Sequence, residues 1–209
     1  MDPNDADIEM ILRLEAVAPL DSWSWLTHGT VSWDAIDQDM IRMFQDLDVM
    51  YKVVETEEGW VVPAPEWAEA CRSATGKLHR RMRQRSLELA GSGPDASVLH
   101  LAPKLEKWTA VRGRSNLSCS LLGHVSGHPL LSNRWSRTSR LCGLAPDLRW
   151  ARTSSRWYRL GTYAEPEHLS RILGPEKGKG ILGAALPLHQ ALLRVEQEQA
   201  REGFRHDDL

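Results

Sequence analysis

Apolar residues in the first ninety positions recur mostly every three or four residues, which is the spacing of an amphipathic helix. Two short runs rich in β-forming residues interrupt this pattern on either side of Thr56 to Glu58 and predict a hairpin. The expected elements are helices over 7–18, 32–47 (N-capped by Ser32) and 66–90, a tryptophan-rich turn over Trp23–His28, and a hairpin of 51–55 with 59–62.

After Gly91–Asp95 the apolar residues recur at every second position, which is the spacing of a strand. Gly91–Asp95 is a stretch of turn-forming residues that we take as a domain boundary. Cys119 and Leu121 then fall on one face of an expected strand, with Ser118 and Ser120 on the other. Strands are predicted over 98–101, 108–112, 117–125, 138–143 and 148–160. Beyond Gly161 the chain returns to helix, with Leu188, Leu192 and Val195 facing inward.

These elements indicate an α+β protein of three parts. An acidic helical domain with one hairpin covers 1–90, a basic module rich in Trp and Arg covers 96–162, and a helical tail covers 163–209. Five or six strands in so short a module suggest a small antiparallel β barrel or a bent sheet.

Two features of the sequence bear on where the protein works. Its N-terminus is acidic, and no uninterrupted apolar run approaches the roughly 18 residues of a membrane span. The three cysteines are an odd number and lie far apart, which argues against a disulfide framework. We therefore expect a cytoplasmic protein with no membrane partner.

Charge is distributed unevenly along a chain whose formal net charge is only -2. Residues 1–70 hold 3 basic and 16 acidic side chains, whereas residues 96–162 hold 11 basic and 2 acidic ones. The order helix, helix, hairpin, helix resembles a winged helix, but its acidic second helix and hairpin would repel phosphate. The acidic part is expected to contact protein or to be purely structural, and the basic part to meet an anionic partner.

The segment 148–160 reads as a hairpin with near-symmetric sequence. A turn at 153–155 would set Arg152 opposite Arg156 and Arg149 opposite Arg159, and like charges directly opposite each other are destabilising. An external phosphate backbone or acidic protein groups would offset that repulsion, and a different turn length would change the pairing. The expected ligand-binding residues are Arg149, Trp150, Arg152, Arg156, Trp157, Tyr158 and Arg159.

Other motifs give weaker signals. Cys119, His124, His128 and Cys142 lack the tight ligand pairs of a structural zinc site, so we predict no metal. The segment Gly174–Gly180 lacks the Ser or Thr that follows the lysine of a phosphate loop, and is expected to be a flexible connector between helices. No Ser or Cys stands in a recognised catalytic context, so the sequence supports no catalytic residue and no cofactor.

The blocks GHVSGHP at Gly123 to Pro129, TS at Thr138 to Ser139 and WARTSSRWYRLG at Trp150 to Gly161 resemble a family. It is a group of small uncharacterised alphaproteobacterial proteins with the pattern GHxxGHP, TS, WARTxSRWYRLG. The resemblance covers roughly Leu117 to Gly161 and implies a self-standing β module in a bacterial cytoplasm, with no activity attached to it.

Together these observations favour a non-enzymatic binding or regulatory protein whose basic module contacts nucleic acid, with arginines on phosphates and Trp150 and Trp157 stacking on bases. The alternative is a protein interaction adaptor in which the arginines dock on acidic protein surface. A small-molecule enzyme is a third interpretation.

Overall fold

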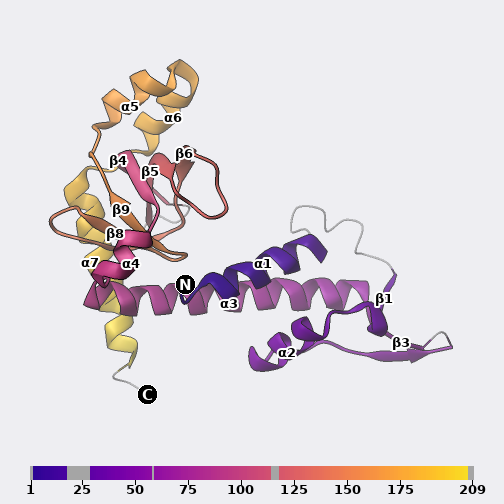
Figure 1. Ribbon diagram of the computed structural model, residues 1–209. Coiled ribbons are helices and arrows are strands. Elements are labelled where there is room, and N and C mark those ends of the chain that lie inside the picture. Colours follow the sequence, from indigo (N-terminus) through magenta and orange to yellow (C-terminus); the bar gives the residue numbers. More distant parts are fainter. Residues whose placement is uncertain (1, 18–28, 58, 114–117, 207–209) are drawn as a thin grey trace. The chain divides into compact units, whose positions relative to one another are not determined.

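The computed structural model describes residues 2–17, 29–57, 59–113 and 118–206 (Figure 1). It divides into two compact units, one of residues 3–81 and one of residues 82–209 with Asp2. The division falls inside helix α3 (Ala64–Ser92), whereas the expected boundary at Gly91–Asp95 lies within the second unit. The expected turn at Trp23–His28 lies outside the described residues.

The balance of helices and strands is that of an α+β protein, as predicted. None of the described helices has both the length and the apolar character needed to cross a membrane.

The first unit combines helices with a small antiparallel sheet. Its sheet has the order β1-β3-β2, so the predicted hairpin is confirmed and a further strand pairs with β3. The helices α1 and α3 are tied together by Arg81, whose Nε donates to the buried Asp7 carboxylate at 3.1 Å. The elements are α1 (Asp5–Val17), β1 (Thr30–Ser32), α2 (Gln38–Asp46), β2 (Val54–Thr56), β3 (Gly59–Pro63) and the first part of α3.

The helix predicted over 32–47 is shorter than expected. Trp33–Ala35 forms only a 3₁₀ turn, at whose start the Ser32 side chain makes no capping bond. Asp37 caps α2 instead, because its carboxylate accepts a hydrogen bond from the Asp39 backbone N–H at 2.9 Å.

The second unit is built on a sheet of the order β6-β5-β4-β9-β8-β7. Its strands are β4 (Lys104–Arg112), β5 (Cys119–Ser126), β6 (Arg134–Arg137), β7 (Leu141–Leu144), β8 (Trp150–Thr153) and β9 (Trp157–Leu160). Neighbouring strands are antiparallel except β4 and β9, which pair in parallel. The strand β6 was not anticipated from the sequence.

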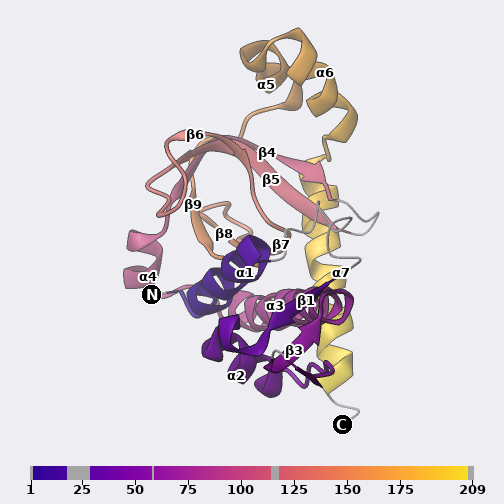
Figure 2. The same ribbon diagram turned by 90° about the vertical axis from the view of Figure 1, so that its right-hand side faces the viewer.

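This sheet is strongly bent, one of the two forms predicted (Figure 2). Its edge strands β6 and β7 are joined by residues 138–140 alone, which can span about 14 Å from Arg137 to Leu141. A flat sheet of six strands would separate those edges by about 24 Å. The edges must therefore curve toward each other, although they are not neighbours in the hydrogen-bonded order, so the sheet does not close into a barrel.

Two predictions for the second unit were wrong. Residues 98–101, predicted as a strand, belong to helix α4 (Ala96–Leu101), and the three-residue spacing of the exposed Val98 and Leu101 suits that helix. The predicted connector at Gly174–Gly180 is mostly helix α6 (Pro175–Ala184). Gly174, with a φ of 81°, ends helix α5 (Pro166–Leu173), and Pro175 then occupies the first turn of α6.

The core of the second unit lies on the inner face of the sheet. Trp108, Leu121 and Leu141 are fully buried there. Helix α7 (Leu188–His206) packs against β4, β5 and β7 with Leu188, Leu192 and Val195, as predicted. The outer face of β5 carries Leu122, which packs on a smaller cluster of Ala164, Leu169 and Ile181 from the α5 and α6 region.

Close packing of α3 against β7 depends on Gly143, since a Cβ there would lie 2.4 Å from the Ala90 Cβ. We expect Gly143→Ala to lower the free energy of unfolding by about 1–3 kcal/mol, because the helix would have to move away. Gly180→Ala is the matched control, because a Cβ there would meet open space on α6. Alanine loses less backbone entropy on folding than glycine, so this variant should raise the free energy of unfolding by about 0.5–1 kcal/mol. Urea denaturation measures both, and equal effects would contradict the packing argument.

Candidate anion-binding site

Strands β8 and β9 form the predicted hairpin with a different register. Trp150 pairs with Arg159 and Arg152 with Trp157, one residue away from the predicted pairing. The loop has two residues rather than three, because Thr153 N–H donates to the Arg156 carbonyl at 2.9 Å. A one-residue shift changes every cross-strand pair, so the predicted arginine pairs were wrong and no like charges stand opposite each other on this ribbon.

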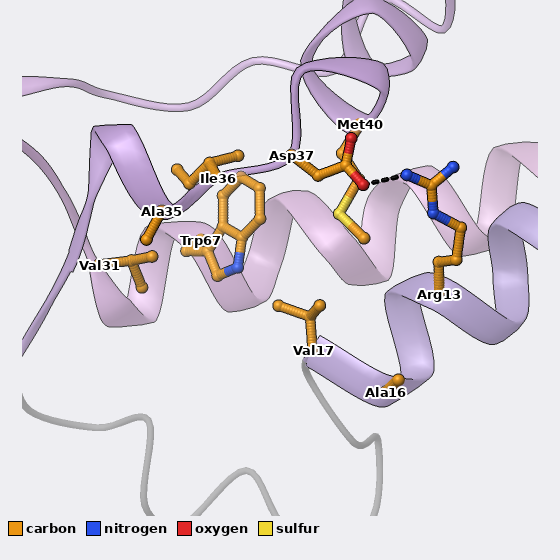
Figure 3. Close-up of a pocket in the computed structure, with 9 residues that line it drawn as sticks. All are labelled: Arg13, Ala16, Val17, Val31, Ala35, Ile36, Asp37, Met40 and Trp67. Carbon is orange, nitrogen blue, oxygen red and sulfur yellow. Dashed lines mark hydrogen bonds and ion pairs between the residues drawn. The ribbon is translucent and has the colours of Figure 1, made fainter.

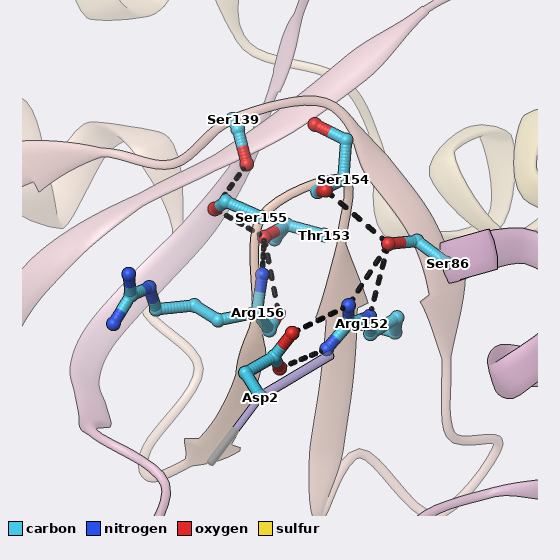
Figure 4. Close-up of polar contacts among 8 residues, drawn as sticks. All are labelled: Asp2, Ser86, Ser139, Arg152, Thr153, Ser154, Ser155 and Arg156. Carbon is cyan, nitrogen blue, oxygen red and sulfur yellow. Dashed lines mark hydrogen bonds and ion pairs between the residues drawn. The ribbon is translucent and has the colours of Figure 1, made fainter. Parts of the chain in front are cut away.

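Arg152 is fully buried, and its guanidinium bonds within the second unit (Figure 4). Its Nη2 donates to Asp2 Oδ1 at 3.1 Å, and Nη1 bonds to the other oxygen of the same carboxylate. Its Nε and Nη2 donate to Ser86 Oγ at 3.1 and 3.0 Å. The Trp157 ring lies 5.3 Å from the guanidinium carbon. This bidentate pairing satisfies the charge with protein groups.

Most other residues expected to bind a ligand also face the interior. Arg156, Trp157 and Tyr158 are buried, and Trp150 is half-buried with its ring 5.2 Å from that of Trp157. The half-buried Arg159 donates through Nε to the Ala102 carbonyl at 3.0 Å. Arg149, with 81% of its side chain exposed, pairs with Asp147. Among the residues predicted to bind a ligand, Arg149 is therefore the one that an extended anion could contact without unpacking the hairpin.

Two further arginines, Arg137 at the end of β6 and Arg140 just before β7, line hollows on the surface of this unit. Two adjoining hollows of about 410 and 480 Å³ meet at Arg137, which lines both. The first, here the apolar hollow, lies between the outer face of the sheet and α6 and is lined by Val111, Leu122, Trp135, Arg137, Leu173, Lys177, Gly180, Ile181 and Ala184. The second, here the polar hollow, is lined by Gly113, Ser118, Ser120, Arg137, Thr138, Ser139 and Arg140.

Strand alternation explains why these two linings differ. Cys119 and Leu121 of β5 point into the core, so Ser120 and Leu122 lie on the opposite face. Ser120 lines the polar hollow and Leu122 the apolar one. The pairing of His124 with Trp135 places the indole of β6 beside this face, with the two rings 5.9 Å apart.

No carboxylate of the described residues lines either hollow. Arg137 donates through Nη2 to the Arg112 carbonyl, a neutral acceptor that leaves its charge in place. Arg140 is held by Nε, which bonds to Glu198 at 2.8 Å, and the buried Glu198 also accepts from Arg83 Nε at 2.7 Å. Glu198 therefore fixes the position of Arg140 through its Nε. The two terminal nitrogens of that guanidinium have no hydrogen-bond partner among the described residues.

Hydroxyl groups complete the polar hollow. Ser118, Ser120 and Thr138 are buried, and the Ser139 hydroxyl lies 2.7 Å from that of Ser155. Thr138 Oγ1 donates to the Ser139 carbonyl and accepts from the Leu121 N–H at 3.0 Å, which fixes the chain at the edge of the sheet. Guanidinium and hydroxyl donors without a lining carboxylate favour an anion such as phosphate.

The sequence reasoning missed the cations that line the hollows because it did not predict β6 or α6. The one available signal was the recurrence of arginine every three residues at Arg134, Arg137 and Arg140. Glu198 carried no signal, since it is 58 residues beyond the arginine that it positions.

Metal binding and thiol chemistry find no support in the described part of the chain. No group of three His, Cys, Asp or Glu side chains there is arranged to hold a metal ion. Burial raises the pKa of Cys119 to about 11 and that of Cys142 to about 12, so both stay protonated at neutral pH.

His128 lies in the connection between β5 and β6 and stacks on Tyr158 at a ring distance of 6.4 Å. Its Nδ1 accepts from the Leu130 N–H at 3.1 Å. Burial, followed by the nearby charges of Arg156 and Arg134, lowers the pKa of His128 to about 4. The imidazole is thus neutral at pH 7.

The buried pair predicts a role for Asp2 in stability. Asp2→Asn leaves the Arg152 guanidinium buried without its anion, and we expect the free energy of unfolding to fall by about 1–3 kcal/mol. Glu9→Gln, at an exposed acid of α1, should change it by no more than about 0.5 kcal/mol. Chemical denaturation of both variants measures the difference, and equal midpoints would argue against the pairing.

His128 should make stability depend on pH. The unfolded state takes up a proton near pH 6.5 and the folded state only near pH 4, so this group's contribution decreases as pH falls between those values. The stability difference between wild type and His128→Asn should therefore shrink from pH 7 to pH 4.5. Denaturation midpoints across this range, with an NMR titration of His128, measure the effect. A gap that stays constant would show that the imidazole titrates normally.

Comparison with known proteins identifies a family model that covers the candidate anion-binding site. The model of a family of unknown function, DUF6634, matches residues 77–190, more than half of the chain. The matched range contains all strands of the bent sheet and every residue that lines the two hollows. No curated protein and no solved structure matches the chain. The expectation of a family without a known activity is thereby confirmed: the chain belongs to DUF6634, a family of unknown function.

Proposed function

We propose that the second unit is a non-enzymatic binding module for single-stranded nucleic acid. Phosphates occupy the polar hollow, where Arg137, Arg140 and the hydroxyl groups provide donors, and a base enters the apolar hollow beside Trp135. The observation that carries the proposal is the junction at Arg137 of a polar hollow and an aromatic-walled one, neither lined by a described carboxylate.

This arrangement suits a chain of nucleotides for two physical reasons. Arg137 and Lys177, for which no carboxylate partner is found among the described residues, create a positive potential, which attracts a polyanion and weakens with salt. An aromatic and aliphatic wall accepts any base by stacking or apolar contact, so the sequence preference is weak. A duplex presents its bases inside a stack, where the apolar hollow could not reach them.

One observation favours a second candidate, a protein interaction adaptor. The most buried arginine of the module, Arg152, already takes a protein carboxylate, that of Asp2, as its partner. An acidic peptide could occupy the polar hollow in the same way, through Arg137 and Arg140. Residence in a bacterial cytoplasm, an alphaproteobacterial source and a role of the acidic residues 1–70 in protein contact stay predictions from the sequence.

The test is fluorescence anisotropy of labelled oligo-dT with the full-length protein at 50 and 200 mM NaCl. We expect binding that weakens with salt, and Arg137→Ala with Lys177→Ala should weaken it about tenfold or more and lower the salt slope by about 1.4, since each cation on a single strand contributes about 0.7. Lys179→Ala is the matched control, because this neighbouring lysine of α6 is exposed and lines neither hollow.

Further arms separate the alternatives. Arg149→Ala reports whether the exposed end of the hairpin contributes to the same surface. Absence of binding at 50 mM NaCl, or an affinity that the double variant leaves unchanged, would contradict the proposal. Binding of a labelled acidic peptide, weakened by the double variant, in place of oligo-dT would support the adaptor instead.

A further inference from the structure

The apolar hollow of the second unit has the size and the lining of a small-molecule pocket. Its volume of about 410 Å³ falls within the range of roughly 300–1,000 Å³ that is usual for such pockets. Most of its lining residues are aliphatic, aromatic or glycine, and they come from β4, β5 and β6 on one side and from α5 and α6 on the other. The charged members of the lining, Arg137 and Lys177, are both cations.

The helical side of this hollow is held in place by contacts outside it. Gly178 of α6 packs so closely on α5 that a Cβ there would lie 2.4 Å from the Ser170 Oγ. The chain that leaves α6 is tied to the sheet, since the Leu186 N–H donates to the Ala110 carbonyl at 2.9 Å. The hollow is therefore formed before a ligand arrives, and binding requires little reorganisation of the chain.

Gly180 keeps the hollow open on the side of α6. It lies in the interior of a helix, where glycine is less favourable than alanine, and it lines the hollow. A Cβ at this position would have no heavy atom within 4 Å. The space that a side chain would occupy here is therefore available to a ligand.

The cations of the apolar hollow are accessible and are not compensated by the described residues. Arg137 donates to the neutral Arg112 carbonyl, and neither Arg137 nor Lys177 forms an ion pair with a described carboxylate. Both side chains are exposed, so a ligand can reach them. The cavity of about 250 Å³ in the first unit shows the opposite case, because its lining cation Arg13 is paired with the lining carboxylate of Asp37 (Figure 3). The apolar hollow therefore favours an anion, which that cavity does not.

The donors of the apolar hollow suit a carboxylate better than a phosphate. A guanidinium can form two parallel hydrogen bonds with the two oxygens of a carboxylate, and an ammonium can add another. A phosphate monoester has three terminal oxygens, and the hydroxyl groups that would complete its hydrogen bonds line the polar hollow instead. The carboxylate is thus expected at Arg137 and Lys177, with an apolar body against Leu122 and Trp135.

We propose that the apolar hollow binds a small hydrophobic carboxylate, which acts as an effector because it occupies the space that a base would enter. A body of one or two rings suits the volume and a lining that includes the Trp135 indole. The binding site goes beyond the recognition of nucleic acid, whereas its regulatory effect rests on the proposed function.

Isothermal titration calorimetry of the full-length protein measures this site without nucleic acid. 2-Naphthoate is the probe, and 2-naphthamide has the same rings without the charge. The carboxylate should bind saturably with a Kd about three- to tenfold lower than that of the amide, because exposed ion pairs contribute modestly. Arg137→Ala with Lys177→Ala should remove this preference. Equal affinities in the wild type, or a preference that the double variant retains, would overturn the proposal.

Two glycine variants of α6 locate the probe. Gly180→Phe places a ring in the hollow and should weaken 2-naphthoate binding about tenfold or more. Gly183→Phe is the matched control, since a Cβ at Gly183 also meets open space but this residue does not line the hollow. Binding that Gly180→Phe leaves unchanged, or that both variants weaken equally, would place the probe elsewhere and contradict the proposal.

A competition experiment separates this site from the proposed function. 2-Naphthoate should raise the apparent Kd of labelled oligo-dT, whereas sodium acetate at the same concentration, which lacks the apolar body, should not. Saturable binding of 2-naphthoate that leaves the affinity for oligo-dT unchanged would overturn its role as an effector. Failure of oligo-dT to bind at all would contradict the proposed function, while calorimetry would still decide whether the hollow takes a carboxylate.

Discussion

The second unit is organised around one buried charge, the guanidinium of Arg152. Burying an unpaired arginine is prohibitively unfavourable, so the chain must supply an anion and further acceptors at that point. Asp2 provides the carboxylate and Ser86 the second acceptor. The same serine hydroxyl lies 3.2 Å from the Ser154 carbonyl, to which it donates, and this bond links α3 to the loop of the hairpin.

That requirement has consequences for the whole ribbon. With Arg152 turned inward opposite Trp157, the register of β8 and β9 is fixed, and Tyr158 joins the core beneath the ring of His128. Two of the eleven basic side chains in residues 96–162, those of Arg152 and Arg156, are therefore buried inside the fold. Among the exposed cations, Arg137 and Lys177 line the apolar hollow, where they can attract a partner.

The candidate anion-binding site of the second unit depends on which cations the fold leaves without a carboxylate. In the second unit, Glu198 fixes Arg140 from behind and no described carboxylate lines the hollows, which selects an anion. A count of charges along the sequence captures this arrangement only coarsely, because it cannot tell a compensated arginine from an uncompensated one.

The sequence by itself determined the α+β class, the long third helix, the first hairpin, the inward face of α7 and the alternation along β5. Each of these follows from a local period of apolar residues, which depends on neighbours a few positions apart. It did not determine the one-residue register of β8 and β9, the strand β6, or the partners of Arg152 and Arg140. Those partners, Asp2 and Glu198, lie 150 and 58 residues away along the chain, and the hollows exist only where the sheet edge meets α6. Tertiary structure decided them, because which charges are buried and paired depends on distances in space that no local pattern records.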